Sequence, residues 1–521
     1  MKNLKYFFAV SVAAITLSSC GDFKDTNYDP NKPSVQAAGP MLLGAQKDLS
    51  YFNYIDIRYN PWAPIYCGYI TGFKNDQFVK FDINMYSAGW IYRTPLLNVS
   101  QLNAQLDKDI KYANNDLGDG ESVKGILECI RAFYFMHVTD ILGNVPYREA
   151  FNAAEGGYTP KYDTQKFIYE DLDKRLSASF KKMNENIKSK YDIIYGGNIS
   201  KWKKFNASLR MIMAMRLSDI EPAVAKERYL KAKSDGVISK NDENFSFLYL
   251  TDAKSANPLY DYTVTRPNQL AFAPSSCIID TMLNNNDIRV VSYASVIPVG
   301  KEKDGDKEKE VYDFLPITFG MSIKDIGLFK EAHPDFSHFP AEMLIANYDQ
   351  KLITAAHMKL IQAEAALRGW TSDKVADLYK EGITLSFETC NLSAGKGEND
   401  ARLKALNLID KRFQSLKKFG SVEEYIAQPQ IALTGNFESD LKKIALQRWV
   451  NNYWKDCVES WADLRKLDYP VIKPGTAAAA VAKLPTRFIY HTDDFDANKE
   501  NHKAGATTPD EPNTRLWWDV K

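Results

Sequence analysis

Apolar residues recur at every third or fourth position along several long stretches of this chain, which is the spacing of an amphipathic α-helix. One such stripe runs through Ser122–Ile141. Two more begin near Asp163 and, after the Gly196-Gly197 pair, near Ser200, and both residues are of types that cap helix starts. The pattern therefore predicts that helices dominate this part of the chain.

The stretch from 353 to 385 contains the clearest repeat. The first apolar stripe consists of Ile353, Ala356, Leu360, Ala363 and Leu367. A turn at Gly369-Trp370 follows, and the second stripe consists of Val375, Leu378, Tyr379, Gly382 and Leu385. Two helices of this length fit one tetratricopeptide-type unit of ~34 residues. A last apolar stripe predicts one continuous helix across Lys443–Lys466.

Helical periodicity is absent from two regions. Residues 51–98 interleave aromatic residues with proline and glycine, which predicts aromatics presented from loops. Residues 241–349 form a loop-rich insert in which we expect short strands, at Phe245–Leu250, Val290–Ile297 and Val311–Leu315. Between the last two, the charged run Gly300–Glu310 lacks the ligand series of a helix-loop-helix calcium site, so we expect a solvated hairpin tip.

The chain begins with the features of a secretory signal. Lys2 and Lys5 precede an apolar run over residues 6–17, which is too short for a ~20-residue membrane span. The run ends in Leu17-Ser-Ser-Cys20, which resembles the lipobox of bacterial lipoproteins; the alternative is an ordinary signal with a chance cysteine. We expect a signal peptide over 1–19, a lipid anchor on Cys20, a tether over 20–33 and a globular domain over 34–521.

Composition and charge narrow the choice of function. Lys+Arg and Asp+Glu both number 66, so the formal net charge is zero and the basic footprint of a nucleic-acid-binding protein is missing. The cysteines other than Cys20 are scattered without metal-like spacing. We expect buried thiols, such as Cys129 and Cys457, and no essential disulfide framework.

Catalytic motifs are missing from the sequence. Nucleophile-elbow, zinc-protease, phosphate-loop and dinucleotide signatures do not occur. His137 lies in an apolar helix stripe and is expected in the core, while His333 and His338 have only a weak metal spacing. Acidic pairs occur at Glu423-Glu424 and Asp493-Asp494, but adjacent surface carboxylates are usually just solvated. We therefore predict no catalytic residue, no metal site and no cofactor.

Several local phrases resemble the SusD/RagB-like lipoproteins, and most closely the branch described as starch-binding and outer-membrane-associated. They follow the family's order over nearly the whole mature chain: Asp140–Tyr147 (DILGNVPY), Gly196–Arg210 (GGNISKWKKFNASLR), Asn257–Tyr260 (NPLY), Asn286–Arg289 (NDIR), Glu459–Arg465 (ESWADLR), Leu484–Tyr490 (LPTRFIY) and Leu516–Asp519 (LWWD). Ile288 and His491 depart from the pattern, because the family often has proline at these positions.

The resemblance implies a mostly helical fold, in which four tetratricopeptide-like helix pairs form a scaffold and an irregular, loop-rich side with a few short strands binds the ligand. It also implies a role without catalysis on the outer membrane of a Gram-negative bacterium. A surface-exposed lipoprotein of this kind captures glycans or peptides and delivers them to a SusC-like TonB-dependent transporter as a hinged lid. A surface glycoside hydrolase, or a helical-repeat scaffold that binds only protein, are the alternatives.

No binding residue transfers from the family by motif, because the matching phrases look structural. Our hypothesis is that the ligand stacks on loop aromatics, and the candidates are Trp62, Trp90, Tyr92, Tyr260, Tyr262 and Phe319. Sugar rings present apolar C–H faces, which suit tryptophan and tyrosine platforms flanked by polar groups. The alternative for each ring is packing against the scaffold.

Overall fold

The structure is a computed structural model, and it describes residues 37–50, 52, 61–74, 85–86, 88–152, 156–252, 254–266, 269–390, 421–478, 484–492 and 496–521. The chain divides into two units, Met1–Ala37 and Ala38–Lys521, and every element named below belongs to the second. The predicted signal peptide, the Cys20 anchor and the tether lie outside the described residues, and the division into domains made from the sequence stays a prediction.

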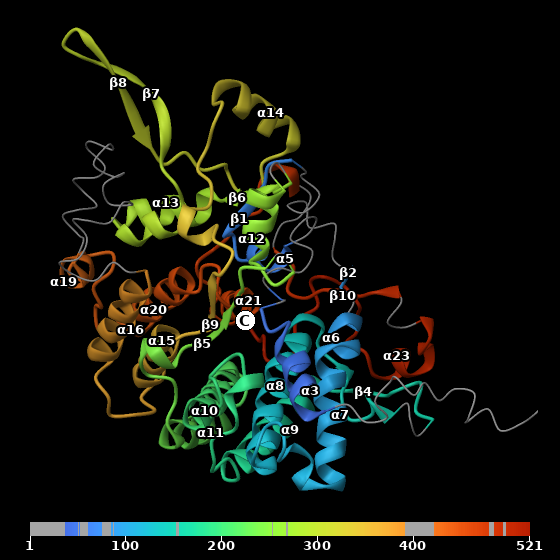
Figure 1. The fold of residues 1–521 in the computed structure, drawn as a ribbon. Coiled ribbons are helices and arrows are strands. Elements are labelled where there is room, and N and C mark those ends of the chain that lie inside the picture. Colours follow the sequence, from blue (N-terminus) through green and yellow to red (C-terminus); the bar gives the residue numbers. More distant parts are fainter. Residues whose placement is uncertain are drawn as a thin grey trace, which may run out of the picture. The chain divides into compact units, whose positions relative to one another are not determined.

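Helices that follow one another in the chain pack against one another (Figure 1). The main series is α3 (Ala38–Gln46), α7 (Pro95–Lys108), α8 (Gly120–Leu142), α9 (Gln165–Phe180), α10 (Ile199–Arg216), α11 (Pro222–Asp235), α15 (Ala355–Leu367), α16 (Val375–Thr389), α20 (Phe437–Asn451) and α21 (Cys457–Leu467). The helix pair that the repeat predicted is present as α15 and α16, which pack against each other, so this prediction is confirmed. The mostly helical, tetratricopeptide-like fold class is confirmed as well.

Shorter helices connect the series. They are α5 (Trp62–Tyr66), α6 (Gly89–Arg93), η2 (Ile110–Ala113), η4 (Ser189–Tyr191), η5 (Asn241–Glu243), α12 (Pro258–Tyr260), the π-turn η6 (Asp261–Thr265), α13 (Ser276–Asn284), η7 (Ile288–Ser292), α14 (Ile323–Ala332), η8 (Ala341–Met343), α19 (Val422–Ile426), η10 (Thr476–Ala478) and α23 (Lys499–Gly505).

Each β-sheet in the described part of the chain consists of two strands. The pairs are β1 (Ile70–Gly72) with β6 (Phe272–Pro274), β2 (Met85–Tyr86) with β10 (Ile489–Tyr490), β3 (Val145–Pro146) with β4 (Tyr162–Asp163), β5 (Phe245–Leu248) with β9 (Asp349–Ile353), and β7 (Ile297–Asp304) with β8 (Lys307–Asp313). All are antiparallel except the β2–β10 pair. The β7–β8 hairpin carries the charged run at its exposed end, as predicted, and projects at the upper left of Figure 1.

Two helix starts differ from the prediction by one or two residues. Thr164 caps α9 by accepting a hydrogen bond from the backbone N–H of Phe167 at 3.2 Å, whereas Asp163 lies in β4 and accepts one from Arg148 Nε at 2.7 Å. Asn198, and not Ser200, caps α10. Neighbouring polar residues can all cap a helix, and tertiary partners decide which one does.

Two larger predictions were wrong. Lys443–Lys466 is not one helix, because α20 ends at Asn451 and α21 begins at Cys457, with Trp454 between them at a φ of +53°. The apolar stripe continued through the break because the intervening residues are also buried. Val290–Ile297 is not a strand, since Asp287 caps the short helix η7 there.

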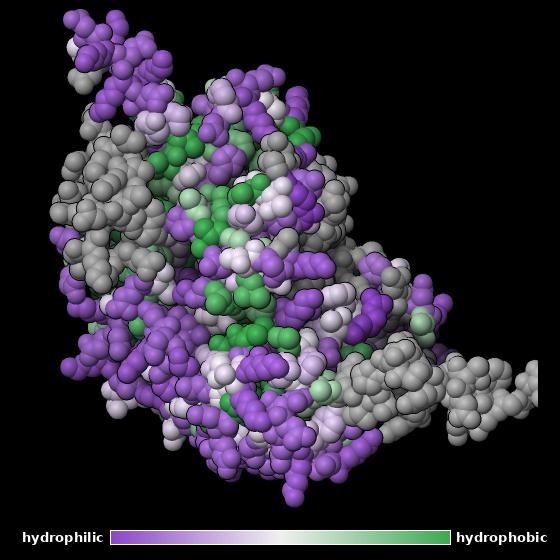
Figure 2. Space-filling view, in the orientation of Figure 1, coloured by the Kyte–Doolittle hydropathy of each residue, from purple (hydrophilic) through white to green (hydrophobic). Residues whose placement is uncertain are grey.

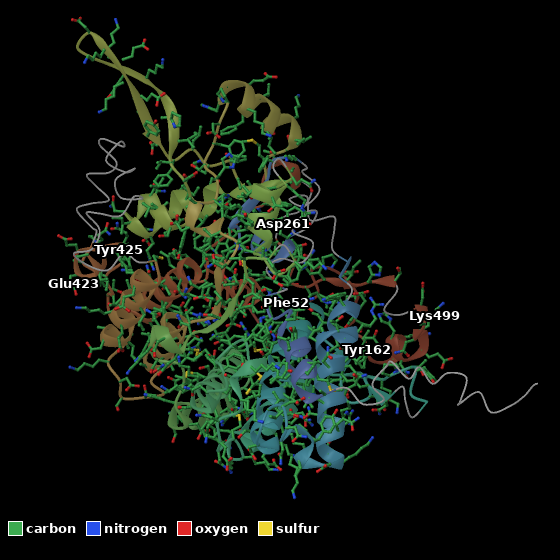
Figure 3. All side chains as sticks on the ribbon, in the orientation of Figure 1. Phe52, Tyr162, Asp261, Glu423, Tyr425 and Lys499 are labelled. Carbon is green, nitrogen blue, oxygen red and sulfur yellow. The ribbon has the colours of Figure 1, made fainter. Side chains whose placement is uncertain are left out.

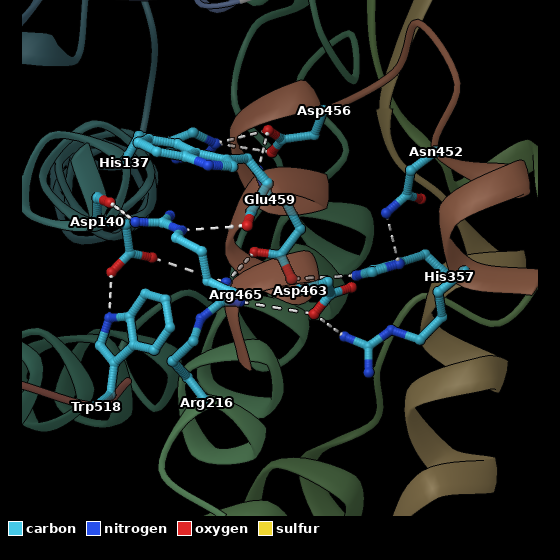
Figure 4. Close-up of polar contacts among 12 residues, drawn as sticks. His137, Asp140, Arg216, His357, Asn452, Asp456, Glu459, Asp463, Arg465 and Trp518 are labelled. Carbon is cyan, nitrogen blue, oxygen red and sulfur yellow. Dashed lines mark hydrogen bonds and ion pairs between the residues drawn. The ribbon is translucent and has the colours of Figure 1, made fainter. Parts of the chain in front are cut away.

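A buried network of ion pairs surrounds α21 (Figure 4). Glu459 pairs with Arg216 of α10, and Asp463, one turn further along α21, pairs with Arg448 of α20. The Arg216 and Glu459 side chains are only 1% and 2% exposed. Charges at this depth are tolerated when they are paired, because the desolvation of an unpaired ion is far larger.

Glu364 of α15 extends the network on one side. Its carboxylate binds Arg448 at 2.6 Å and Lys466 at 2.6 Å. Desolvation alone would raise the pKa of Glu364, but Lys466, Arg368 and Arg448 together hold it well below its usual range. Burial lowers the pKa of Lys466 to about 8, so the pair stays ionised at neutral pH.

Asp140 of α8 extends the network on the other side. Its carboxylate accepts hydrogen bonds from the Tyr169 hydroxyl at 2.7 Å and from Trp518 Nε1 at 2.8 Å. Arg465 of α21 donates to the backbone oxygens of Asp140 at 2.7 Å and Thr486 at 2.8 Å. The network therefore joins α8, α9 and α21 to the C-terminal segment.

His137 is buried in the core, as the sequence predicted. Its Nδ1 lies 2.7 Å from the backbone oxygen of Phe133, and its Nε2 lies 2.8 Å from the carboxylate of Asp456. Two acceptors call for two N–H groups, which favours the imidazolium form. Burial lowers the pKa of His137, but Asp456, the Phe133 carbonyl and Glu459 outweigh it and raise the pKa above its ordinary value of 6.5.

The cysteines of the described residues are all free, and Cys129 and Cys457 are buried thiols, as predicted. Burial raises the pKa of Cys457 well above its usual range, so the group stays a neutral thiol.

Removing Arg216 should strongly destabilise the fold. The substitution Arg216→Met leaves the Glu459 carboxylate buried without its main cation, and breaking a buried pair from one side costs about 3–5 kcal/mol. Urea unfolding should show a loss of this order. The control Glu308→Gln removes the exposed partner of Lys301, and it should change stability by less than about 1 kcal/mol. Equal losses in the two variants would contradict the importance of the network.

The His137–Asp456 pair should stabilise the protein in a pH-dependent way. A group whose pKa is higher in the folded protein stabilises the fold below its unfolded pKa, and the contribution disappears as the pH rises through the folded pKa. The unfolding free energy of His137→Gln should lie furthest below wild type under pH 6.5, the ordinary value, and the gap should narrow at alkaline pH. A gap that does not change with pH would mean that the imidazole is neutral in the fold.

Candidate ligand-binding groove

A groove beside α6 and the β3–β4 pair has the composition of a ligand site. Its volume is about 430 Å³, which falls within the range of small-molecule sites. Its lining is mostly apolar and aromatic: Ala88, Gly89, Tyr92, Arg93, Leu142, Val145, Pro146, Ala150, Gly157, Tyr158, Pro160, Tyr162 and Tyr490. Figure 3 labels Tyr162, close to α23 where Lys499 is labelled. The groove thus gathers residues from four separate parts of the sequence.

Tyrosine hydroxyls bonded to the backbone hold the walls of the groove. The Tyr92 hydroxyl donates to the backbone oxygen of Pro146 at 2.6 Å. The Tyr490 hydroxyl donates to the backbone oxygen of Asn144 at 2.5 Å and accepts from the backbone N–H of Thr507 at 3.0 Å. Burial raises the pKa of Tyr490, so the hydroxyl stays protonated. Walls fixed in this way reduce the ordering that a ligand must impose.

The floor of the groove, formed by Leu142, Val145 and Pro146, depends on the turn at Gly143. This residue ends α8 with a φ of +86°, and a Cβ atom there would lie 2.2 Å from Thr507 Oγ1. Only glycine fits this turn, because it combines a left-handed backbone with a close approach. The turn sends Val145 and Pro146 into β3, opposite Asp163 and Tyr162 of β4.

Two side chains at the groove have no partner among the described residues. Tyr158 is 78% exposed, and its side chain makes no ring contact or hydrogen bond with them. Arg93, the last residue of α6, is also exposed and forms no ion pair with them. These two side chains are therefore available to a ligand.

The described lining of the groove is poor in the side chains that most often carry acid–base or nucleophilic catalysis. None of its described lining residues is Asp, Glu, His, Cys, Ser or Lys. The nearest carboxylates along the chain are already paired, because Glu149 binds Lys161 at 3.3 Å and Asp163 binds Arg148 at 2.5 Å. The arrangement can bind a ligand through ring faces and one cation.

The structure separates the six aromatic residues predicted as ligand platforms. Tyr92 lines the groove, and Trp90 lies on the same short helix with 45% of its surface exposed. Tyr260 and Tyr262 are half-buried on α12 and η6, away from the groove lining, and the Arg266 guanidinium lies 4.2 Å from the Tyr262 ring centre. A ligand role for these four residues stays a prediction.

The other two candidates, Trp62 and Phe319, are buried in the core at 2% and 3% exposure. The Trp62 ring lies 4.8 Å from Phe488 and 5.8 Å from Trp461, in edge-on contacts. Neither ring face is presented to solvent here, which corrects the expectation that loop aromatics of this region point outward. The proline and glycine around them mark a loop, but they do not show which way its side chains point.

Sequence reasoning missed Tyr158, Tyr162 and Tyr490. Tyr158 follows Gly156-Gly157 and precedes Pro160, and this turn-forming context around an aromatic residue could have suggested an exposed ring. Tyr490 belongs to the LPTRFIY phrase and was treated as structural. No local signal joins these residues to Tyr92, because only the tertiary fold brings them together.

A second hollow of 410 Å³ between α7, α8 and α9 is a weaker candidate. Six of its charged side chains are already paired with one another: Lys124 with Asp107 at 2.5 Å, Arg175 with Glu128 at 2.8 Å, and Lys182 with Glu121 at 3.2 Å. The remaining one, Arg131, lies over the rings of Phe135 and Tyr147. A ligand would have to break these pairs to bind there.

His357, Glu459 and Asp463 form a buried triad that could in principle hold a metal, because their ligand atoms lie within 4.8 Å of one another. Both carboxylates, however, already bind arginines, Glu459 through Arg216 and Asp463 through Arg448. A divalent cation would add two charges to a site where the existing cations balance the anions. We therefore assign the triad to the ion network (Figure 4).

The remaining candidates from the sequence are surface groups. The half-buried His338 pairs with the exposed Asp335 at 3.2 Å, and Glu423 pairs with Lys380 at 2.9 Å, both exposed. Glu424 forms a capping box with Ser421 at the start of α19. Asp493 and Asp494 lie outside the described residues.

Comparison with known families places the chain among the SusD-like proteins. The family model described as "Starch-binding associating with outer membrane" matches residues 30–491. The chain therefore belongs to this family. No curated protein matches it.

Solved structures share the fold over nearly their whole length. A chitin-binding protein is 23% identical, with a TM-score of 0.71, over 93% of this chain and 100% of its own. A chitin-binding SusD homolog from Flavobacterium johnsoniae is 20% identical, with a TM-score of 0.69, over 92% and 98%. A SusD homolog from Bacteroides fragilis is 21% identical, with a TM-score of 0.72, over 92% and 98%.

The described part of the chain contains helices of up to 23 residues. None of its helices combines the length and the apolar character that crossing a bilayer requires.

Alanine substitutions should distinguish core residues, whose loss lowers stability, from groove residues, whose loss lowers ligand affinity. Trp62→Ala removes a buried ring and should lower the unfolding free energy by about 3–5 kcal/mol. Tyr158→Ala should leave stability unchanged and weaken binding of starch or chitin oligosaccharides by about 0.5–1.5 kcal/mol, because it removes only a stacking surface. Tyr158→Phe keeps the ring and should retain most of the affinity. Calorimetry of unfolding and of binding measures both effects, and destabilisation by Tyr158→Ala would contradict the assignment.

Proposed function

We propose that this protein is a surface lipoprotein that binds oligosaccharides and delivers them to a SusC-like TonB-dependent outer-membrane transporter, over which it closes as a hinged lid. One observation carries the proposal. An aromatic groove whose described lining residues include no carboxyl group occurs in a chain of a family described as starch-binding and associated with the outer membrane.

The chemistry of the groove favours a sugar ligand. Pyranose rings have apolar C–H faces that pack on aromatic rings, and their hydroxyls need polar groups at the edge. Tyr92 and Tyr162, which are half-buried, supply the ring surface, while Tyr490 is buried at 2% exposure and serves as part of the wall. Tyr158 and Arg93 supply polar groups at the rim. Two solved relatives are named as chitin-binding, which supports a glycan over a peptide.

Binding without turnover fits the site better than hydrolysis. A glycosidase requires two carboxyl groups about 5–10 Å apart, on either side of the scissile bond. The described residues that line the groove include no carboxyl group. A scaffold that binds only protein is the other alternative, and it would give the aromatic groove no ligand.

The predicted lipid anchor and an exposed apolar surface support the proposed association with a transporter. An acylated Cys20 would hold the protein at the membrane and keep it at high effective concentration near a transporter. Figure 2 shows apolar residues gathered across the middle of the face on which Figure 1 places α12 and the β5–β9 pair. Leu248, Leu250 and Ile345 are each exposed by 44–54%, and exposed apolar surface of this kind marks interaction sites.

The purified protein should bind oligosaccharides without consuming them. Titration calorimetry with starch and chitin oligosaccharides should give saturable binding by wild type, and chromatography after long incubation should recover the same oligosaccharides. Release of shorter products would favour the hydrolase. Binding of peptides but of no saccharide would overturn the glycan assignment.

Membrane attachment and partnership can be tested together in cells. Wild type should fractionate with the outer membrane, be removed by protease added to whole cells, and co-purify with a TonB-dependent barrel in mild detergent. The variant Cys20→Ala should lose the membrane association, because no lipid remains. Membrane association of this variant, or protection of wild type from external protease, would contradict the proposed location.

A further inference from the structure

Arg93 differs from every other described residue that lines the groove, because it alone carries a charge. It is the last residue of α6, it is exposed, and it makes no ion pair or hydrogen bond within the described part of the chain. The family phrases do not contain it. A cation at the edge of an aromatic groove can select ligands by charge.

The charges nearest to the groove along the chain do not neutralise Arg93. Glu149 lies next to the lining residue Ala150, and its carboxylate accepts hydrogen bonds from Lys161 Nζ at 3.3 Å and from the backbone N–H of Lys161 at 3.0 Å. Asp163, next to Tyr162, binds Arg148 at 2.5 Å. Each of these two anions is already matched by a cation, so neither of them compensates the positive charge of Arg93.

The helix to which Arg93 belongs does not account for it. A cation in the last turn of a helix interacts favourably with the macrodipole, but α6 has only five residues, so few peptide dipoles are aligned. The guanidinium is instead free to form a bidentate pair with a planar anion, for which its geometry is suited.

We propose that the groove binds an acidic oligosaccharide, in which a sugar carboxylate pairs with Arg93 while the sugar rings pack on the tyrosines. This inference rests on the proposed function and adds the ligand class. The Tyr92 and Tyr490 hydroxyls already donate to backbone oxygens, so among the described lining residues Arg93 is the charged donor left to receive the anion. The apolar lining lowers the local dielectric and strengthens the pair.

A neutral sugar in the same place would bind less tightly. It would remove water from the guanidinium without supplying a charge in return, and an ion left unpaired on desolvation opposes binding. The site therefore discriminates by charge between ligands of the same shape.

Oligogalacturonate and its methyl ester provide a matched pair of probes, since they differ only at the carboxyl group, which is charged in the acid and is a neutral methyl ester in the other. Wild type should bind the acid at least about tenfold more tightly, the ratio that corresponds to 1.4 kcal/mol for a charge-assisted pair. Arg93→Gln should lose this preference by weakening the acid about tenfold and leaving the ester unchanged. Added salt should weaken binding of the acid and not of the ester.

Control variants show whether the effect belongs to the groove. Lys324→Gln on α14 removes another exposed cation that has no ion pair among the described residues, and it should bind both probes as wild type does. Tyr158→Ala should weaken both probes alike. Thermal unfolding of every variant should match wild type, because none of the three side chains is buried.

The outcomes separate this inference from the function on which it rests. Equal affinity for acid and ester, or an acid preference that survives in Arg93→Gln, overturns the charge selection while saccharide binding stands. If alginate and hyaluronan oligomers, oligogalacturonate, starch and chitin oligomers all fail to bind, both proposals fail. Binding of peptides with a free C-terminal carboxylate, but of no uronate, overturns the saccharide assignment.

Discussion

The pairing of buried charges around α21 is the constraint on which the rest of the structure depends. Glu459 and Asp463 lie on one face of a helix that is almost entirely buried, so each must meet a cation. Those cations, Arg216 and Arg448, come from α10 and α20. The helices can therefore pack in few ways without leaving an ion unpaired, and this makes the network a source of specificity as well as of stability.

The same region also places the groove. Asp140 belongs to the network, and three residues later Gly143 turns the chain into β3 at the groove floor. Arg487 donates to the backbone oxygen of Leu142 at 3.2 Å, and Tyr490 reaches Asn144. The floor and one wall are thus attached to the most tightly bonded part of the core, while Tyr158 and Arg93 at the rim remain unconstrained by the described residues.

Relatives at 20–23% identity share the fold with TM-scores near 0.7. The phrases typical of the family contain Asp140, Glu459, Asp463, Arg465 and Trp518, and all five take part in the buried network. They preserve the scaffold and carry no information about the ligand. Function in such a fold depends on the residues placed at the site, which here lie outside those phrases or contribute only a wall.

Apolar periodicity alone determined that the chain is mostly helical, because a buried helix face imposes its spacing on the sequence. The α15–α16 pair, the charged β7–β8 hairpin and the buried His137 follow from local pattern. The break between α20 and α21 does not, because a turn whose residues remain buried leaves the stripe uninterrupted. Only tertiary structure decided that Trp62 packs inward while Tyr92, Tyr158 and Tyr490 meet in one groove, since contacts between distant residues have no local signature.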